Sequence, residues 1–330
     1  MIFLWVQFFI ASAIIILAGT RLSYVGDGIA EKKKWGRTWV GLILISISTS
    51  LPELFTSCAA SGMEKQPNLV YGTLLGSVCF NLAIFAFLDL IEGRGALSSK
   101  LSRSLVFNGG LSILLILLAV SGILFLDRFS IGWIGISSFL ILIVYIVGSK
   151  LYFDRNVKDA VETGLNEFKF SKVSTASLWR NYILCAFFIL VAGLWLARTG
   201  DAISHKTGIG RSFMGFMFLA IVSSLPELST TIVAVRNKFY DMAVGIILGS
   251  NCFNMLIFFA ADLLYPRGPI SRYASKESIV MAGLGICLTS ILMLGIVRRC
   301  QKALFRLGWD AVSMIILYLL GAIWLYYGAG

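Results

Sequence analysis

Residues 48–54 read Ser-Thr-Ser-Leu-Pro-Glu-Leu and place the carboxylate of Glu53 inside a long apolar run. A related stretch, Val-Ser-Ser-Leu-Pro-Glu-Leu at residues 222–228, places Glu227 inside a second apolar run. A charged side chain at the centre of a bilayer costs about 3 kcal/mol or more, so acids within membrane segments are rare and usually functional. Two such acids in matching contexts therefore predict a shared functional site.

The composition of the whole chain indicates an integral membrane protein. Of the 330 residues, 58% are apolar and only 14% are charged, whereas soluble domains have about 25% charged residues. Apolar runs of roughly 20 residues are long enough to cross a bilayer as helices. The first run is expected to be a retained helix rather than a signal peptide. The runs predict an all-α membrane protein with ten transmembrane helices, at residues 2–20, 38–61, 68–91, 104–126, 130–149, 181–200, 211–235, 240–264, 278–297 and 307–328.

The chain also repeats itself. The order Ala18-Gly19, Gly26-Asp27, Gly36-Arg37 returns 174 residues later, and residues 72–81 match residues 245–254 at a spacing of 173. Five predicted helices in each half is an odd number, so the second half would enter the membrane from the opposite side. We therefore expect two inverted five-helix repeats with a binding site between them near the midplane. The expected boundaries are 1–149 for the first repeat, 150–180 for a basic cytosolic connector and 181–330 for the second repeat.

The basic residues predict the orientation in the membrane. Most of the 28 Lys and Arg residues fall in the odd-numbered connections between predicted helices, which places those connections in the cytosol and both termini outside it. The net charge of +11 is thus explained without a nucleic-acid partner. Six dispersed cysteines and a single histidine, His205, argue against a disulfide framework, a zinc site or a resident cofactor.

Residues around the two glutamates supply hard oxygen ligands. Pro52 and Pro226 remove backbone N–H groups, which should free carbonyls near Ser48, Thr49, Val222 and Ser223. Four pairs of polar residues share a helix face at a spacing of four, namely Thr49 with Glu53, Ser223 with Glu227, Ser77 with Asn81, and Ser250 with Asn254. Carboxylate, hydroxyl and amide oxygens suit Ca²⁺ and alkali cations.

Simpler roles remain open for several of these residues. The glutamates could be neutral and hydrogen-bonded in a helix interface. The glycines near 72–76 and 245–249, and Ser77 and Ser250, could serve only close helix packing. Asp89 and Asp262, and likewise Asp27 and Asp201, are expected near helix ends in solvated or capping roles.

The four motifs resemble those of the calcium/cation antiporter superfamily, in particular its sodium/calcium exchanger family with two α-repeats. Here α-repeat 1 spans about 38–91 and α-repeat 2 about 211–264, and the G-S-x-x-F-N helices read Gly-Ser-Val-Cys-Phe-Asn and Gly-Ser-Asn-Cys-Phe-Asn. Ser48 and Val222 stand where the family has glycine, Val78 replaces an asparagine, and Asn254 stands where prokaryotic relatives commonly have aspartate. The resemblance implies that the ligands are Glu53 and Glu227 with oxygens of Thr49, Ser50, Ser223, Ser224, Ser77, Asn81, Ser250 and Asn254.

These features predict a secondary antiporter that exchanges Ca²⁺ for Na⁺ by alternating access, in the cell (plasma) membrane, rather than an enzyme. The nearest alternative is the same fold exchanging protons or another cation. An intramembrane acid-dyad enzyme and a non-transporting scaffold or ion sensor are more remote alternatives. The number of Na⁺ ions and the oligomeric state do not follow from the sequence.

Overall fold

The computed structural model describes residues 1–33, 35, 37–63, 65–93, 96–162, 173–207, 221, 223–299, 303–304 and 307–328. Their helices are α1 (Ile2–Lys33), α2 (Arg37–Trp39), the π-helical turn η1 (Val40–Ile45), α3 (Ser46–Thr49), α4 (Leu51–Gly62), α5 (Pro67–Glu92), α6 (Leu105–Leu124), α7 (Ile136–Glu162), α8 (Thr175–Thr207), α10 (Leu225–Arg236), α11 (Tyr240–Leu263), α12 (Lys276–Arg298) and α13 (Trp309–Gly328). Short 3₁₀ turns are η2 (Leu97–Lys100), η3 (Leu126–Arg128) and η4 (Ile270–Tyr273). Two small hairpins pair β1 (Ser130–Ile131) with β2 (Ile134–Gly135) and β3 (Ala303–Leu304) with β4 (Leu307–Gly308).

The fold is that of an all-helical membrane protein. Seven described helices are long and apolar enough to cross a membrane, and the bent pair Arg37–Thr49 and Leu51–Gly62 makes an eighth candidate when it is counted as one span. Helix α13 is also apolar but shorter. Residues 208–220 and Val222 lie outside the described part of the chain, so the first part of α-repeat 2 is not described.

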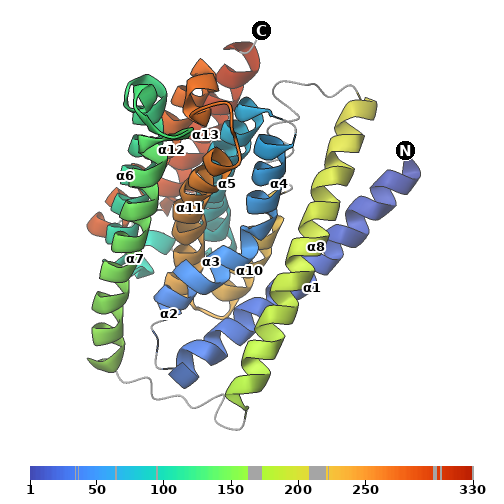
Figure 1. The fold of residues 1–330 in the computed structure, drawn as a ribbon. Helices are drawn as coiled ribbons and strands as arrows, with labels where there is room; N and C mark the ends of the chain where they lie inside the picture. Colours follow the sequence, from blue (N-terminus) through green and yellow to red (C-terminus); the bar gives the residue numbers. More distant parts are fainter. Residues whose placement is uncertain are drawn as a thin grey trace.

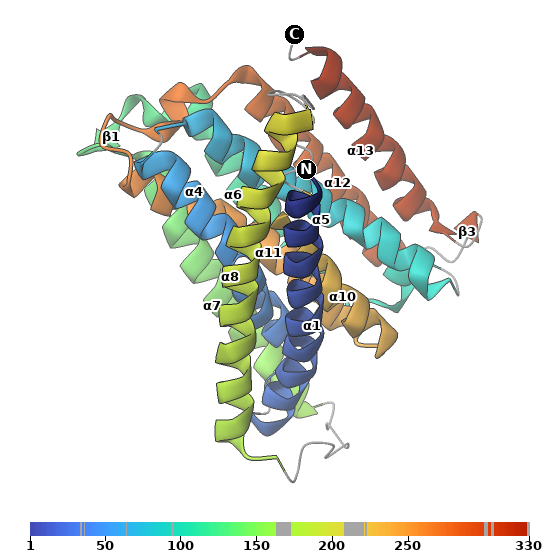
Figure 2. The same cartoon turned by 90° about the vertical axis from the view of Figure 1, so that its right-hand side faces the viewer.

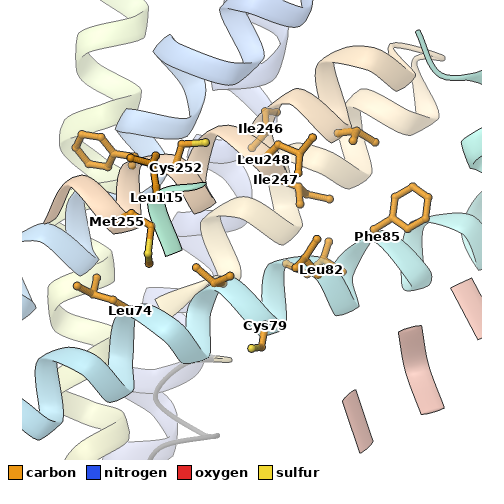
Figure 3. Close-up of a cluster of buried hydrophobic side chains, with 14 of the residues drawn as sticks. Leu74, Cys79, Leu82, Phe85, Leu115, Ile246, Ile247, Leu248, Cys252 and Met255 are labelled. Atoms are coloured by element: carbon orange, nitrogen blue, oxygen red, sulfur yellow. The ribbon is translucent and has the colours of Figure 1, made fainter. Parts of the chain in front are cut away.

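Helices α1 and α8 form a long antiparallel pair along one side of the bundle (Figures 1 and 2). A small apolar cluster of Ala11, Ile15, Ala192 and Leu196 holds the pair together. The main core lies among the other helices, and its centre is the crossing of α5 with α11, where Leu82 and Ile247 belong to one buried cluster (Figure 3). Helices α5 and α11, which carry one motif from each half, are therefore the most deeply enclosed of the candidate membrane spans.

Three helices are longer than the sequence predicted. Helix α1 continues to Lys33, and Asp27, expected past a helix end, lies inside it and is 2% exposed. Its Oδ1 accepts a hydrogen bond from Arg37 Nε at 2.5 Å, so the solvated role predicted for Asp27 is wrong. Helix α7 continues to Glu162 and α8 begins at Thr175, so both enter the interval predicted as connector. The side chains of Asp201 and His205 lie outside the described residues.

Asp89 and Asp262 are capping residues, as predicted, but they are completely buried rather than solvated. Asp89 Oδ1 accepts the N–H of the first residue of η2 at 2.5 Å, and its Oδ2 accepts the N–H of the last residue of β4 at 2.6 Å. Asp262 makes the matching bonds to the first residue of η4 and the last residue of β2, at 2.7 and 2.8 Å. The same structural unit therefore follows α5 in one half and α11 in the other.

Candidate cation site

Both glutamates lie in the first turn of a helix that starts at a backbone break. Ser50 precedes α4 with φ −91° and ψ 9°, and Ser224 precedes α10 with φ −89° and ψ 10°. Pro52 is the second residue of α4, so no N–H is available to the carbonyl of Ser48. The segment is bent by 45° at this break. The break turns the helix start, with its N–H groups and its carboxylate, into the centre of the molecule.

The two carboxylates are buried together. Glu53 and Glu227 are each 1% exposed, and they are near enough to interact electrostatically. Glu227 Oε1 accepts hydrogen bonds from Ser50 Oγ at 2.8 Å and from Ser250 Oγ at 3.2 Å. Because Ser50 comes from the first half and Ser250 from the second, the carboxylate joins the two halves of the chain.

Two further contacts bring the remaining motifs to the same place. The hydroxyls of Thr49 and Ser250 are 3.5 Å apart, and those of Ser77 and Ser223 are 3.3 Å apart. These pairs are counterparts in the sequence repeat. All four motifs therefore meet between α3, α4, α5, α10 and α11.

Within the described part of the chain, several polar atoms around this meeting point have no hydrogen-bond partner. They are buried atoms of predicted ligands, namely Glu53 Oε1 and Oε2, Glu227 Oε2, Ser224 Oγ, Asn81 Oδ1, and Asn254 Oδ1 and Nδ2. An unsatisfied buried polar group costs about 1–3 kcal/mol, and more when it is charged. A group of unpartnered oxygens is what a desolvated cation would require. Within the described residues no three His, Cys, Asp or Glu side chains form a metal-binding group, so neutral oxygens would have to complete the coordination of any ion here.

Two contacts in this region were not predicted from the sequence. Asn81 Nδ2 donates to Asn251 Oδ1 at 3.0 Å. Tyr182 of α8 donates to the carbonyl of Leu44 at 2.6 Å, and its hydroxyl is 2.6 Å from Ser48 Oγ. The residue Ser48, which replaces the glycine of the resembled motif, thus contacts a neighbouring helix. Val78 and Asn251 are counterparts in the sequence repeat but differ in residue type. This difference was the only sequence signal that pointed to Asn251.

Comparison with known proteins gives consistent matches over most of the chain. The sequence model described as sodium/calcium exchanger protein matches residues 3–151 and again residues 179–327. Inner membrane protein YrbG of Escherichia coli is 30% identical over 253 residues, covering 73% of this chain and 74% of the relative. Sodium/calcium exchanger MaX1 of Methanosarcina acetivorans is 24% identical over 330 residues, covering 88% and 92%.

The fold is also similar to that of a solved exchanger. A structure of the sodium-calcium exchanger NCX_Mj, soaked with Na⁺ and Sr²⁺, matches with a TM-score of 0.74 at 22% identity. The match covers 98% of this chain and 99% of that one. At this identity the likeness is one of fold.

Proposed function

The chain belongs to the sodium/calcium exchanger protein family, and from this membership we propose that it is a secondary antiporter that exchanges Ca²⁺ for Na⁺ by alternating access. The family and the fold are those of membrane exchangers, so we propose transport rather than catalysis. The ions are the cargo, and the exchange needs no resident cofactor.

The observation that carries this proposal is the pair of buried glutamates with unpartnered oxygens. Their two negative charges are neutralised by one Ca²⁺ or by two Na⁺. Without cations, two unpaired anions remain in a region of low dielectric, which is strongly unfavourable. The empty site should therefore resist the change between its two accessible states, and this resistance couples the movement of one ion to the return of the other.

We propose that the ligands come from both halves of the chain. Glu53 and Glu227 supply the charge, and Ser50, Thr49, Ser77 and Asn81 with their counterparts Ser224, Ser223, Ser250 and Asn254 supply neutral oxygens. The burial of this set and its unpartnered atoms support the assignment. A hard-oxygen set without imidazole or thiolate favours Ca²⁺ and Na⁺ over softer metals.

We further propose ten membrane crossings in two inverted five-helix repeats. The match of one family model to both halves supports a repeat, as do the corresponding backbone breaks at Ser50 and Ser224. The start of α1 and the end of α13 lie towards the same end of the bundle (Figures 1 and 2), as an even number of crossings requires. With the basic connections in the cytosol, both termini would be extracytoplasmic and the plasma membrane would be the site of action.

Uptake of ⁴⁵Ca²⁺ into proteoliposomes tests the function directly. Vesicles loaded with Na⁺ and diluted into Na⁺-free buffer should accumulate Ca²⁺, and vesicles loaded with K⁺ should not. A parallel arm with an imposed proton gradient separates sodium exchange from proton exchange. Uptake driven by protons and not by Na⁺ would replace the proposal with the proton-coupled alternative.

Two matched variants connect the flux to the site. Glu53→Gln and Glu227→Gln keep the side-chain shape and remove one charge each, so either change should abolish Na⁺-driven uptake. Asn108→Val changes a buried asparagine of α6 outside the proposed ligand set and should leave uptake near the wild-type level. Uptake preserved in either glutamine variant would contradict a central site.

A further inference from the structure

Asn251 is a buried side chain that contacts the proposed ligand set without belonging to it. It lies in α11 and is completely buried. Its Oδ1 accepts a hydrogen bond from Asn81 Nδ2 at 3.0 Å, and its Nδ2 donates to the carbonyl of Val78 at 3.5 Å. These two contacts determine which way each amide is turned.

The direction follows from donor and acceptor chemistry. The carbonyl of Val78 can only accept, so Asn251 must present its amide nitrogen to it and its oxygen to the opposite side. That oxygen can only accept in turn, so Asn81 must present Nδ2 to Asn251. Asn81 Oδ1 then points elsewhere, and it is buried with no hydrogen-bond partner among the residues that the structure describes. The two hydrogen bonds therefore fix which end of each amide is the oxygen and which is the nitrogen, a choice that is ambiguous for an isolated amide.

The second half lacks this arrangement. In the sequence repeat the counterpart of Asn81 is Asn254, and the counterpart of Asn251 is Val78. A valine side chain neither donates nor accepts hydrogen bonds. Accordingly, in the part of the chain that the structure describes neither Asn254 Oδ1 nor Asn254 Nδ2 has a partner, and no equivalent contact there determines the orientation of this amide.

We propose that Asn251 is a positioning residue that holds Asn81 Oδ1 toward the transported cation, whereas the amide of Asn254 turns to suit the bound ion. The inference rests on the proposed function. A hard cation such as Ca²⁺ or Na⁺ is attracted by the amide oxygen and repelled by the N–H₂ group, so a fixed orientation favours binding. Partners that orient metal ligands typically contribute 10- to 100-fold to affinity.

The test uses binding, so that it does not depend on transport. Ca²⁺ and Na⁺ are titrated against the thermal unfolding of the purified full-length protein in detergent. Asn251→Val reproduces the residue found at the counterpart position 78, and it should raise the half-saturating Ca²⁺ concentration about tenfold. The control Asn108→Val makes the same chemical change at a buried position outside the ligand set and should not alter it.

A double-mutant cycle identifies the route of the effect. Asn81→Ala should weaken Ca²⁺ binding at least as much as Asn251→Val, and adding Asn251→Val to Asn81→Ala should weaken it no further. Additive losses would show that Asn251 acts independently of Asn81 and would overturn the inference. An unchanged titration of Asn251→Val beside a responsive wild type would overturn the inference alone. A wild type stabilised by neither cation would overturn the proposed function with it.

A second pair of variants applies even if Asn251→Val fails to fold. Asn81→Asp places a carboxylate oxygen opposite Asn251 Oδ1, or forces Asn251 to turn its oxygen toward the carbonyl of Val78. Asn254→Asp creates neither a contact between two oxygens nor a need for Asn251 to turn its amide. In cation-free buffer Asn81→Asp should therefore unfold at a clearly lower temperature than Asn254→Asp. Equal unfolding temperatures would overturn the inference.

Discussion

Glu53 and Glu227 occupy matching positions in the sequence repeat, yet their carboxylates have different neighbours. Glu227 Oε1 accepts hydrogen bonds from two serines, whereas among the described residues neither oxygen of Glu53 has a hydrogen bond of good geometry, and the side chain that interacts with it is the hydroxyl of Ser223. Hydrogen bonds to a charged group contribute about 1.5–3 kcal/mol each. Glu53 therefore depends more strongly than Glu227 on a bound cation for its stability in the folded protein.

The counterpart serines Ser50 and Ser224 provide a matched test of this difference. Ser50 donates to Glu227, and Ser224 Oγ has no partner among the described residues. In cation-free buffer Ser50→Ala should lower the free energy of unfolding by about 2 kcal/mol, and Ser224→Ala should change it by much less. Chemical unfolding followed by tryptophan fluorescence measures both. Equal losses of unfolding free energy would show that the surroundings of Glu53 and Glu227 are equivalent in the absence of cations.

The neutral side chain of Asn254 bears on the pH dependence of transport. Asn254→Asp adds a third carboxylate to the proposed ligand set, and protons compete with cations for a carboxylate. Uptake by the aspartate variant should therefore fall more steeply than wild-type uptake as the pH is lowered. Initial rates of ⁴⁵Ca²⁺ uptake between pH 5 and pH 8 would show the difference, and superimposable profiles would refute it.

At the scale of single residues, the sequence identified which side chains gather but not how each is oriented. The repeat brought out Asn81 and Asn254 because both copies keep them. It gave no indication that Asn251 orients Asn81, because that contact joins residues 170 positions apart. Burial of Asp89 and Asp262 was also missed, since their partners belong to turns that only the folded chain brings near.

At the scale of helices, the largest departure from prediction is the length of α1. Gly26 and Asp27 read as the start of a loop, yet α1 continues through them to Lys33. Gly26 packs closely against a neighbour, because a Cβ atom there would lie 2.7 Å from Ile45 Cδ1. Asp27 is paired with Arg37. Tertiary contacts therefore override the weak local helix propensity, and such contacts cannot be inferred from local composition.

A second element-scale feature connects α8 to the bent helix. The Tyr182 hydroxyl donates to the carbonyl of Leu44 in the π-helical turn η1 and contacts Ser48 Oγ. The counterpart residues in the other half are Phe8 and Val222, neither of which has a hydroxyl. The contact is therefore specific to one half and should stabilise the conformation in which it forms.

Tyr182→Phe isolates this contact. Loss of a hydrogen bond worth about 1 kcal/mol should increase local opening, and hence amide exchange, about fivefold in residues 40–48. Hydrogen–deuterium exchange read by mass spectrometry would measure the increase. Tyr24→Phe, which alters an exposed tyrosine of α1, should leave exchange in this segment unchanged. Equal exchange in all three proteins would mean that Tyr182 does not stabilise the bent helix.

At the scale of the whole molecule, the α1–α8 pair contacts the two halves unequally. A Cβ atom on Gly193 of α8 would lie 2.9 Å from Pro52 Cβ. By the repeat, Gly19 of α1 should face Pro226. Instead it faces Ser229 and Thr230, with Thr230 Cγ2 3.2 Å from its ideal Cβ position. The register differs by three to four residues, or about 5 Å at 1.5 Å per residue. If the two halves form the proposed inverted repeat, this structure would be one of two unequal states of the transporter.

Under the proposed alternating access, exchange of these two registers would give the second state. Gly19 would then lie against Pro226, and Gly193 against Phe55 and Thr56, through movement of the α1–α8 pair along α4 and α10.

In a cysteine-free background, Gly19→Cys with Ser229→Cys should form a disulfide in the present state, because Ser229 Cβ is 3.4 Å from the ideal Cβ position of Gly19. Gly193→Cys with Phe55→Cys should crosslink only when the pair has moved. Each crosslink should stop Na⁺-driven Ca²⁺ uptake, and a reductant should restore it. Failure of the second crosslink during active exchange, beside ready formation of the first, would show that access alternates by a different movement.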